Sequence, residues 1–441
     1  MSPTFRSLSN PNYRLYAAGG AVSNVGTWMQ RVAQDWLVLQ LTAYSGVALG
    51  VTTGLQFLPV LLLSPFAGLA ADRIPKRLLL QLTNVGMAVT ALVLGVLAVT
   101  GTAEIWHVYV LALVLGTAAA FDAPARQSFV SEMVHADDLT NAVGLNSASF
   151  NAARIVGPAI AGVLIAALGG GAVATGWVIL VNALTYAAPI VMLRRLDVSA
   201  LRSPRPMERG PGQILAGVSY VRSRPDLMLI LAIVFFAGTF GLNFQMTSAL
   251  MATEVFDKGP AEYGLLGTFM AVGSLTGSLL AATRQGVRLR LVVGSALAFA
   301  GIEIVSGLMP SYLTFALVTP VLGLAALTMI TAANAYMQLN TDEGMRGRVM
   351  ALYMMIFIGG TPFGAPLVGW VGEAFGARWT LVLGGLITAA GVVGAGLWFA
   401  RARVGGTRRG SPGVSVLTPD QRPSNLVPRV WDNQAVARAR K

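Results

Sequence analysis

Long apolar runs dominate this chain, each roughly 18 to 25 residues long and separated by short polar stretches, which is the length a helix needs to cross a bilayer core. Of the 441 residues, 55% are hydrophobic and only 11% are charged. A soluble protein needs more charge than this to coat its surface. The pattern therefore predicts an all-α integral membrane protein.

The runs predict twelve transmembrane helices, about six in each half of the chain. A longer polar interval, 194–226, separates an N-terminal half (1–193) from a C-terminal half (227–400), and Gln213–Arg224 within this interval is predicted to form a surface helix. The last part, 401–441, is rich in Arg, Pro, Gly and Ser and is predicted to be a disordered basic tail. The predicted spans are 14–41, 46–70, 78–100, 106–125, 141–168, 172–193, 227–250, 262–283, 290–309, 312–337, 347–371 and 377–400.

Lysine and arginine are distributed unequally between the loops. Alternate loops, together with both termini, are rich in these residues, whereas the intervening loops hold only Lys258 and Arg378. Cytoplasmic loops of membrane proteins carry an excess of Lys and Arg. The asymmetry predicts a multi-pass protein of the cell membrane with both termini in the cytoplasm. The same distribution explains the net charge of +12 without a nucleic-acid partner.

Several chemistries are excluded by composition. There is no cysteine, and the two histidines, His107 and His135, lie far apart in sequence, so no metal site and no cofactor is expected. The three lysines, Lys76, Lys258 and Lys441, do not belong to a nucleotide-binding G-x-x-x-x-G-K-[ST] loop, and hydrolase motifs are also absent from the sequence. We therefore expect neither an enzyme nor a nucleotide-driven pump.

The two halves share a spacing of small residues. Three glycines of the fifth predicted span recur in the eleventh at a constant offset of 207 residues, from 157 to 364, and Ala153, Phe150 and Leu145 have partners at the same offset. Coincidence between unrelated apolar segments is the alternative. A parallel repeat of this kind is typical of transporters that bind substrate near the midplane, between halves that rock against each other. The glycine pairs are Gly157 and Gly364, Gly162 and Gly369, and Gly169 and Gly376.

A turn with a carboxylate and a basic cluster follows the second predicted span. The segment Gly68-Leu-Ala-Ala-Asp72-Arg73-Ile-Pro75-Lys76-Arg77 resembles the loop motif of the major facilitator superfamily, apart from Pro75, where that family has glycine. Proline also makes turns. The resemblance implies a cytoplasmic gate in which Asp72 and Lys76 meet an acidic residue at the end of span four. The candidate is Asp122, which Arg126 follows by one helical turn.

The fifth span adds a second resemblance. Gly144, Ala153, Gly157-Pro158 and Ala161-Gly162 are similar to the exporter motif of the same superfamily, with alanine at two glycine positions and Arg154 at a position where a basic residue is sometimes found. Ordinary packing of small residues is the alternative. The motif favours export over import.

The opening segment resembles one bacterial branch of the superfamily. Asn10-Pro-Asn-Tyr-Arg14-Leu, Gly26-Thr-Trp28-Met-Gln30 and Trp36-Leu-Val-Leu are similar to the branch of the enterobactin exporter and the macrolide efflux proteins. The resemblance implies the major facilitator fold, a monomer, and proton-coupled or other ion-coupled export of a small amphipathic compound such as a drug, an antibiotic or a siderophore.

The first span carries unusual polar residues on one helical face, Asn24, Trp28, Arg31 and Asp35. A charge inside a span is costly and normally faces a cavity or a partner. Arg31 and Asp35 are one turn apart, so they are expected to pair. Either this pair only fixes helix packing, or Asp35 is a proton-coupling carboxylate that Arg31 modulates.

Spans seven and ten repeat this spacing, and the resemblance implies that they line the cavity with spans one and four. An aromatic and polar lining suits an amphipathic organic substrate. Glu303, alone on span nine, is a second coupling candidate or a partner for a basic residue. A scaffold without transport and an importer of a small metabolite remain alternatives. The substrate-cavity candidates on these two spans are Phe236, Phe240, Asn243, Thr331, Asn334 and Gln338.

Overall fold

The computed structural model describes residues 3–202, 213–282, 284 and 286–408. The regular secondary structure of these residues is helical throughout, and no strand occurs among them. Residues Met1–Phe399 form one compact unit and Ala400–Lys441 a second. The predicted disorder of the tail concerns mostly residues beyond Arg408, which lie outside the described part of the chain.

The N-terminal half contains six membrane-length helical segments. A short 3-10 helix, η1 (Pro3–Ser9), precedes α1 (Pro11–Leu41), which begins where the Asn10 side chain caps it and a proline follows. The next helices are α2 (Gly46–Arg73), α3 (Lys76–Val99), α4 (Ile105–Met133) and α5 (Ala136–Ala167). The sixth span is divided between α6 (Ala172–Thr185) and α7 (Ala187–Arg195).

The C-terminal half begins after α8 (Gln213–Arg222), which confirms the helix predicted in the polar interval. Its seventh span is interrupted: α9 (Pro225–Phe236), the π-helical turn η2 (Ala237–Gly241), α10 (Phe244–Leu250) and a second π-helical turn, η3 (Met251–Val255). Then come α11 (Pro260–Ala282), α12 (Leu289–Gly307) and α13 (Tyr312–Leu339). The eleventh span comprises α14 (Glu343–Gly359) and α15 (Thr361–Phe375), and α16 (Ala377–Arg408) is the twelfth.

Eleven of these stretches, within the described residues, are long and apolar enough to cross a membrane. The twelfth is α1, which is too polar to meet that criterion. At 1.5 Å per residue its 31 residues extend about 46 Å, enough to cross a bilayer. The predicted all-α membrane fold with twelve spans is therefore confirmed, and α1 is the span with the most polar residues to accommodate.

The glycines shared between the halves occupy equivalent places. A Cβ atom at Gly157 would lie 2.6 Å from Trp28 of the first span, and one at Gly364 would clash with backbone of the seventh span. Both spans then end at a glycine with positive φ, +103° at Gly169 and +96° at Gly376. Only glycine adopts such φ values without strain. The repeat is thus a repeat of helix packing as well as of sequence.

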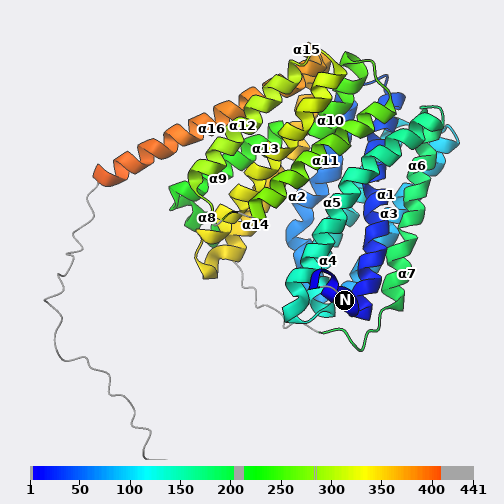
Figure 1. Cartoon of the computed structure of the whole chain (residues 1–441), viewed down its shortest axis with the longest axis horizontal. Coiled ribbons are helices and arrows are strands. Elements are labelled where there is room, and N and C mark those ends of the chain that lie inside the picture. The colour runs from blue at the N-terminus through cyan, green and yellow to red at the C-terminus, as the bar shows by residue number, and fades with distance from the viewer. Residues whose placement is uncertain (1–2, 203–212, 283, 285, 409–441) are drawn as a thin grey trace, which may run out of the picture. The chain divides into compact units, whose positions relative to one another are not determined.

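Two seams join the halves, α2 along α15 and α5 along α11 (Figure 1). They are related by the same repeat. A Cβ atom at Gly162 would clash with the carbonyl oxygen of Pro260, and one at Gly369 would clash with that of Gly46. Small residues allow backbones in membranes to approach this closely. The fifth and eleventh spans therefore each pack against the other half at its nearest helix.

We call the end of the bundle that holds η1, the α2–α3 and α4–α5 junctions and the C-terminal end of α7 the basic side, and the other end the opposite side. Several contacts between the halves lie toward the opposite side. Glu373, at the end of α15, accepts hydrogen bonds from the Ser45 hydroxyl and, at 3.0 Å, from the Val47 backbone N–H. Trp36 stacks on Tyr263 with 6.4 Å between ring centroids. The halves are therefore held together at the opposite side.

Candidate functional site: the cavity between the halves

A cavity of about 210 Å³ lies where the first and second spans meet the seventh and eleventh. Its charged lining residues are Arg31 and Asp35, both from α1. Amide side chains and apolar side chains supply the rest of the wall, which makes the cavity suitable for a ligand with both polar and apolar parts. The other lining residues are Gln34, Thr53, Gln56, Phe57, Gly238, Leu242, Asn243, Gln245, Met246, Phe357, Ile358 and Thr361.

Asp35 connects the two halves. Its side chain is nearly buried, with 8% exposed, and its Oδ2 accepts hydrogen bonds from Gln245 Nε2 at 2.7 Å and from the Tyr263 hydroxyl at 2.8 Å. Both donors belong to the C-terminal half, on α10 and α11. Hydrogen bonds to a charged acceptor are stronger than those between neutral groups. The carboxylate thus forms part of the contact that closes the opposite side.

The expected pairing of Arg31 with Asp35 is wrong, because no ion pair joins them among the residues that the structure describes. The Arg31 guanidinium instead lies over the ring of Trp28, 4.9 Å from its centroid. Arg154 of α5 approaches the same indole, at 5.6 Å. Asp35 is turned toward donors of the other half, so the two side chains diverge although they are one turn apart.

The first-span face is divided by the structure. Arg31 and Asp35 line the cavity. Trp28 does not line it but packs against Arg31, and Asn24 is half-buried and outside the lining. Sequence reasoning missed Gln34 on the same helix and Thr53 and Gln56 on α2. The signal was present, because polar residues inside an otherwise apolar span are themselves unusual.

The seventh span differs from its predicted helical face. Asn243 lines the cavity, but Phe236 and Phe240 do not. The cause is the π-helical turn η2, which takes more residues per turn than an α-helix and rotates the downstream side chains. A regular i, i+4, i+7 spacing therefore does not describe one face here.

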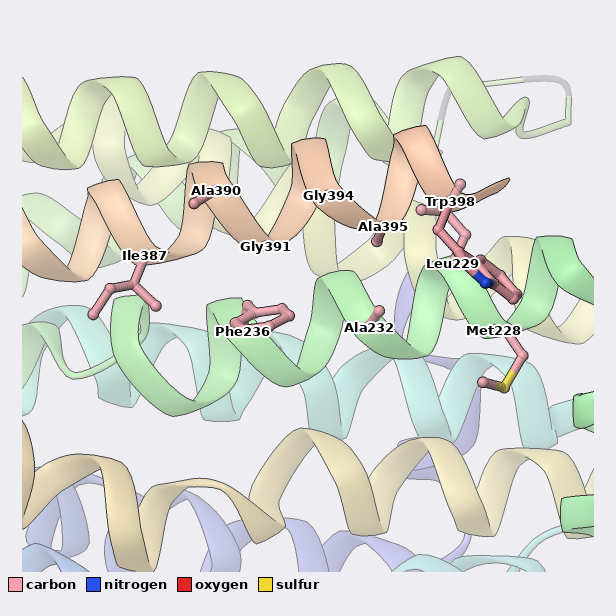
Figure 2. Close-up of a pocket in the computed structure, with 10 residues that line it drawn as sticks. All are labelled: Met228, Leu229, Ala232, Phe236, Ile387, Ala390, Gly391, Gly394, Ala395 and Trp398. Carbon is pink, nitrogen blue, oxygen red and sulfur yellow. The ribbon is translucent and has the colours of Figure 1, made fainter. Parts of the chain in front are cut away.

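Phe236 lines a separate pocket of about 570 Å³ between α9 and α16 (Figure 2). Figure 2 shows its ring on α9 next to Gly391 of α16, where a Cβ atom would clash with the ring. The lining is apolar and includes Met228 of α9 and Trp398 of α16. Exposed apolar neighbours such as Leu397, 58% exposed, indicate that this face meets lipid.

The three candidates on α13 lie outside the 210 Å³ cavity. The Thr331 hydroxyl donates to the Leu327 carbonyl at 2.7 Å within its own helix. Gln338 is exposed and donates to Asn334 at 2.5 Å. Their polar groups are satisfied along the helix, and the tenth span does not form the wall of this cavity.

Glu303 on α12 is buried, with 1% exposed, and lies between two glycines of neighbouring spans. A Cβ atom at Gly241 would lie 3.0 Å from its Oε2, and one at Gly384 would lie 3.1 Å from its Oε1. Oε2 has no hydrogen-bond partner and no ion pair involves Glu303 within the described chain. The expected basic partner is therefore missing from its described surroundings.

The predicted gate at the basic side has a different acidic partner. Lys76 Nζ lies 2.5 Å from Glu132 Oε1, and not beside Asp122 as expected. Asp122 is nearly buried and accepts from Arg126 Nε at 2.7 Å and from the Thr83 hydroxyl at 2.9 Å. The reason is length: α4 continues to Met133, so its last turns, and not Asp122, reach the loop after α2.

The rest of this loop follows the predicted motif. Pro75 precedes α3 as its N-cap residue with φ −51°, which confirms that proline makes the turn. Arg77 donates to the carbonyl oxygens of Leu193 at 2.6 Å and Arg194 at 3.1 Å, so it ties α3 to the end of α7. Asp72 and Arg73 are exposed and Gly68 is half-buried.

The fifth-span motif is mainly a packing surface. Gly157, Pro158 and Gly162 are buried against α1 or α11, and Gly264 approaches the Pro158 carbonyl oxygen so closely that a Cβ atom there would clash with it. Gly144 is exposed with open space around it. Within the described residues no cluster of three or more acidic or histidine side chains suits a metal ion.

Two six-helix halves around a cavity that both halves line define a membrane transporter of the two-bundle kind. A family model described as "Transmembrane secretion effector" matches residues 2–405. The chain belongs to this family of the major facilitator superfamily, which confirms the resemblance that its motifs predict. It is accordingly a transporter and not an enzyme.

Relatives with stated functions cover most of the chain. The staphyloferrin A transporter of Staphylococcus aureus is 24% identical over 368 residues, 82% of this chain and 90% of its own length. The multidrug efflux pump Tap of Mycolicibacterium fortuitum is 28% identical over 381 residues, 83% of this chain and 90% of its own length. The fold is also that of a bacterial homologue of the lysosomal transporter Spinster in an inward-facing, unoccupied conformation, with a TM-score of 0.65, 16% identity, and coverage of 94% of this chain and 100% of that one.

Proposed function

We propose that this transporter exports small amphipathic organic compounds across the cell membrane in exchange for protons, by alternating access to the cavity between its halves. The carrying observation is Asp35, a carboxylate that lines the cavity and accepts hydrogen bonds from Gln245 and Tyr263 of the other half. One side chain thereby contacts both the ligand space and the closure between the halves.

Protonation of Asp35 would change this closure. An ionised carboxylate only accepts hydrogen bonds, whereas a protonated one has a donor of its own and less charge to attract donors. Proton binding therefore weakens the bonds from Gln245 and Tyr263 and favours separation of the halves at the opposite side. Substrate release and proton uptake then occur in the same conformation, as exchange requires.

We place the basic side in the cytoplasm, with both termini, because the Lys and Arg residues of the loops gather there. The contacts of Glu373 with Ser45 and of Trp36 with Tyr263 then close the outer side. With the outer side closed, this transporter would load substrate from the inside. The siderophore and drug relatives support a substrate of this general kind.

Inside-out membrane vesicles test the proposal. With a proton gradient, wild-type vesicles are expected to accumulate a fluorescent amphiphile in the lumen and to release lumenal protons as they do so. Asp35→Asn should abolish both, whereas the matched variant Asp137→Asn, exposed at the start of α5, should behave like wild type. Accumulation by Asp35→Asn at the wild-type rate contradicts the coupling role. Movement in the opposite direction indicates import, and no movement of any compound in a broad panel indicates a scaffold.

A further inference from the structure

Two arginines approach one indole ring at the edge of the cavity. Arg31 lies 4.9 Å and Arg154 5.6 Å from the centroid of Trp28, and the two guanidiniums come from different helices, α1 and α5. A single cation over an aromatic face is a common stabilising contact. Two cations on one ring repel each other, so ring packing alone does not account for both.

The two guanidiniums make few polar contacts among the described residues. No ion pair involves Arg31 or Arg154 within the described residues, and the nearest carboxylate on α1, Asp35, accepts instead from Gln245 and Tyr263. Arg154 has one weak contact, 3.4 Å from its Nη2 to the Ser274 hydroxyl. Unpaired charges inside a membrane protein are costly, and they normally have a partner or a function.

Trp28 itself adds a third donor. Its indole Nε1 is buried and has no hydrogen-bond partner among the residues that the structure describes. The ring is held in place, because Gly157 of α5 packs so close to it that a Cβ atom at Gly157 would lie 2.6 Å from the Trp28 Cβ atom, and Phe150 meets the ring edge-on at 5.6 Å. A buried donor without an acceptor costs free energy. Three donor groups are thus gathered in one place, and the weak contact of Arg154 with Ser274 is the one hydrogen bond that their side chains donate among the described residues.

We infer that Arg31, Arg154 and Trp28 form the binding site for a carboxylate group on the transported compound. Arginine binds carboxylates through two parallel N–H donors, which suits an anion better than it suits a neutral or cationic head group. The apolar body of the compound would occupy the adjoining cavity beside Phe57, Met246 and Phe357. This inference rests on the proposed export function and specifies the substrate class as carboxylate-bearing amphiphiles.

A matched series of probes tests the substrate class directly. The three tritiated compounds are 4-(1-naphthyl)butyrate, the corresponding alcohol, and the corresponding trimethylammonium compound, which differ only in the head group. Equilibrium binding is measured by scintillation proximity on the full-length protein in lipid nanodiscs, with empty nanodiscs as the background. Wild type is expected to bind the carboxylate at least about tenfold more tightly than the alcohol, since a hydrogen-bonded charge contributes that much, and the ammonium compound most weakly.

Variants then locate the anion. Arg31→Gln and Arg154→Gln should each reduce carboxylate binding about tenfold or more and leave alcohol binding unchanged. Arg31→Lys should retain part of the preference, because it keeps the charge but not the planar pair of donors. The control Arg288→Gln removes an exposed arginine before α12 and should change nothing.

Equal binding of the three compounds by wild type, preference for the ammonium compound, or no binding of any of them overturns the inference, and none of these comparisons depends on a variant that folds. A loss of all three affinities together in Arg31→Gln also overturns it, because that pattern indicates a structural role. Proton-coupled efflux in vesicles is measured separately. Export of neutral or cationic dyes without a carboxylate preference would refute the substrate class and leave the export function intact.

Discussion

Replacing Tyr263 by phenylalanine removes one of the two hydrogen bonds that Asp35 accepts from the other half. The phenol oxygen lies 2.8 Å from Asp35 Oδ2, and the side chain is buried with 1% exposed. A hydrogen bond to a charged group contributes about 1.5–3 kcal/mol. If the bond exists only when the opposite side is closed, its loss shifts the ratio of closed to open molecules by about 10- to 100-fold, at 1.4 kcal/mol per tenfold.

Pulsed electron–electron resonance measures this ratio. The chain has no cysteine, so Tyr44→Cys and Phe375→Cys introduce a unique pair of spin-label sites. Tyr44 precedes α2 and Phe375 ends α15, and both side chains are exposed at the opposite side, 43% and 59%. We expect Tyr263→Phe to add a population with longer distances between the labels. As the pH is lowered, this open population should appear at a higher pH in Tyr263→Phe than in wild type.

Tyr353→Phe is the control for this experiment. Tyr353 is also 1% exposed, but its hydroxyl contacts the Ile330 carbonyl oxygen at 3.4 Å within the C-terminal half. The control should keep the wild-type distance distribution. The same distribution in Tyr263→Phe would refute the reasoning, because it would show that the bond to Asp35 does not favour the closed state.

Three further predictions concern other parts of the molecule. Glu132→Gln leaves Lys76 unpaired where both side chains are nearly buried. The free energy of unfolding in detergent should therefore fall by about 3 kcal/mol, and adding Lys76→Gln to the same chain should recover part of the loss. Gly162→Leu should force α5 away from Pro260 and lower the fraction closed at the opposite side in the spin-label assay, whereas Gly144→Leu, in open space, should not. Glu303→Gln should leave vesicle efflux within about twofold of wild type, because Glu303 lines no part of the 210 Å³ cavity; complete loss of efflux would show that Glu303 is a coupling site.

The packing of the fold could be predicted from the sequence because it depends on patterns that one helix displays by itself. Apolar run lengths located the spans, and the glycines at 157 and 364 marked close approaches that the structure places against equivalent helices. Both signals are local. Contacts between distant segments were less accessible. Lys76 was expected to meet Asp122, but α4 continues to Met133 and brings Glu132 to Lys76 instead.

The seventh span shows why the site was harder to predict than the fold. Its residues have the same i, i+4, i+7 spacing as α1, but the π-helical turn η2 lies between Phe236 and Asn243 and rotates Asn243 relative to Phe236. Phe236 therefore faces the lipid side, whereas Asn243 lines the cavity. No single residue of Ala237–Gly241 predicts a π-helix. Hydrogen-bond partners from another helix could not be predicted from the sequence either, as the pairing of Tyr263 with Asp35 shows.

The positions of the charges and their partners suggest different roles for the two halves. The charged groups that line the cavity, Arg31 and Asp35, belong to the N-terminal half, as does Arg154 beside Trp28. The neutral donors to Asp35 come from the C-terminal half. A neutral donor adjusts to either protonation state of a carboxylate at a smaller electrostatic cost than a cation. The C-terminal half can therefore detach from Asp35 when it is protonated without leaving a charge unpaired, and the interrupted seventh span, which supplies Gln245, is the element best suited to move. Binding of an anion by the two arginines and of a proton by Asp35 would then occur on one rigid half, with the other half responding to both.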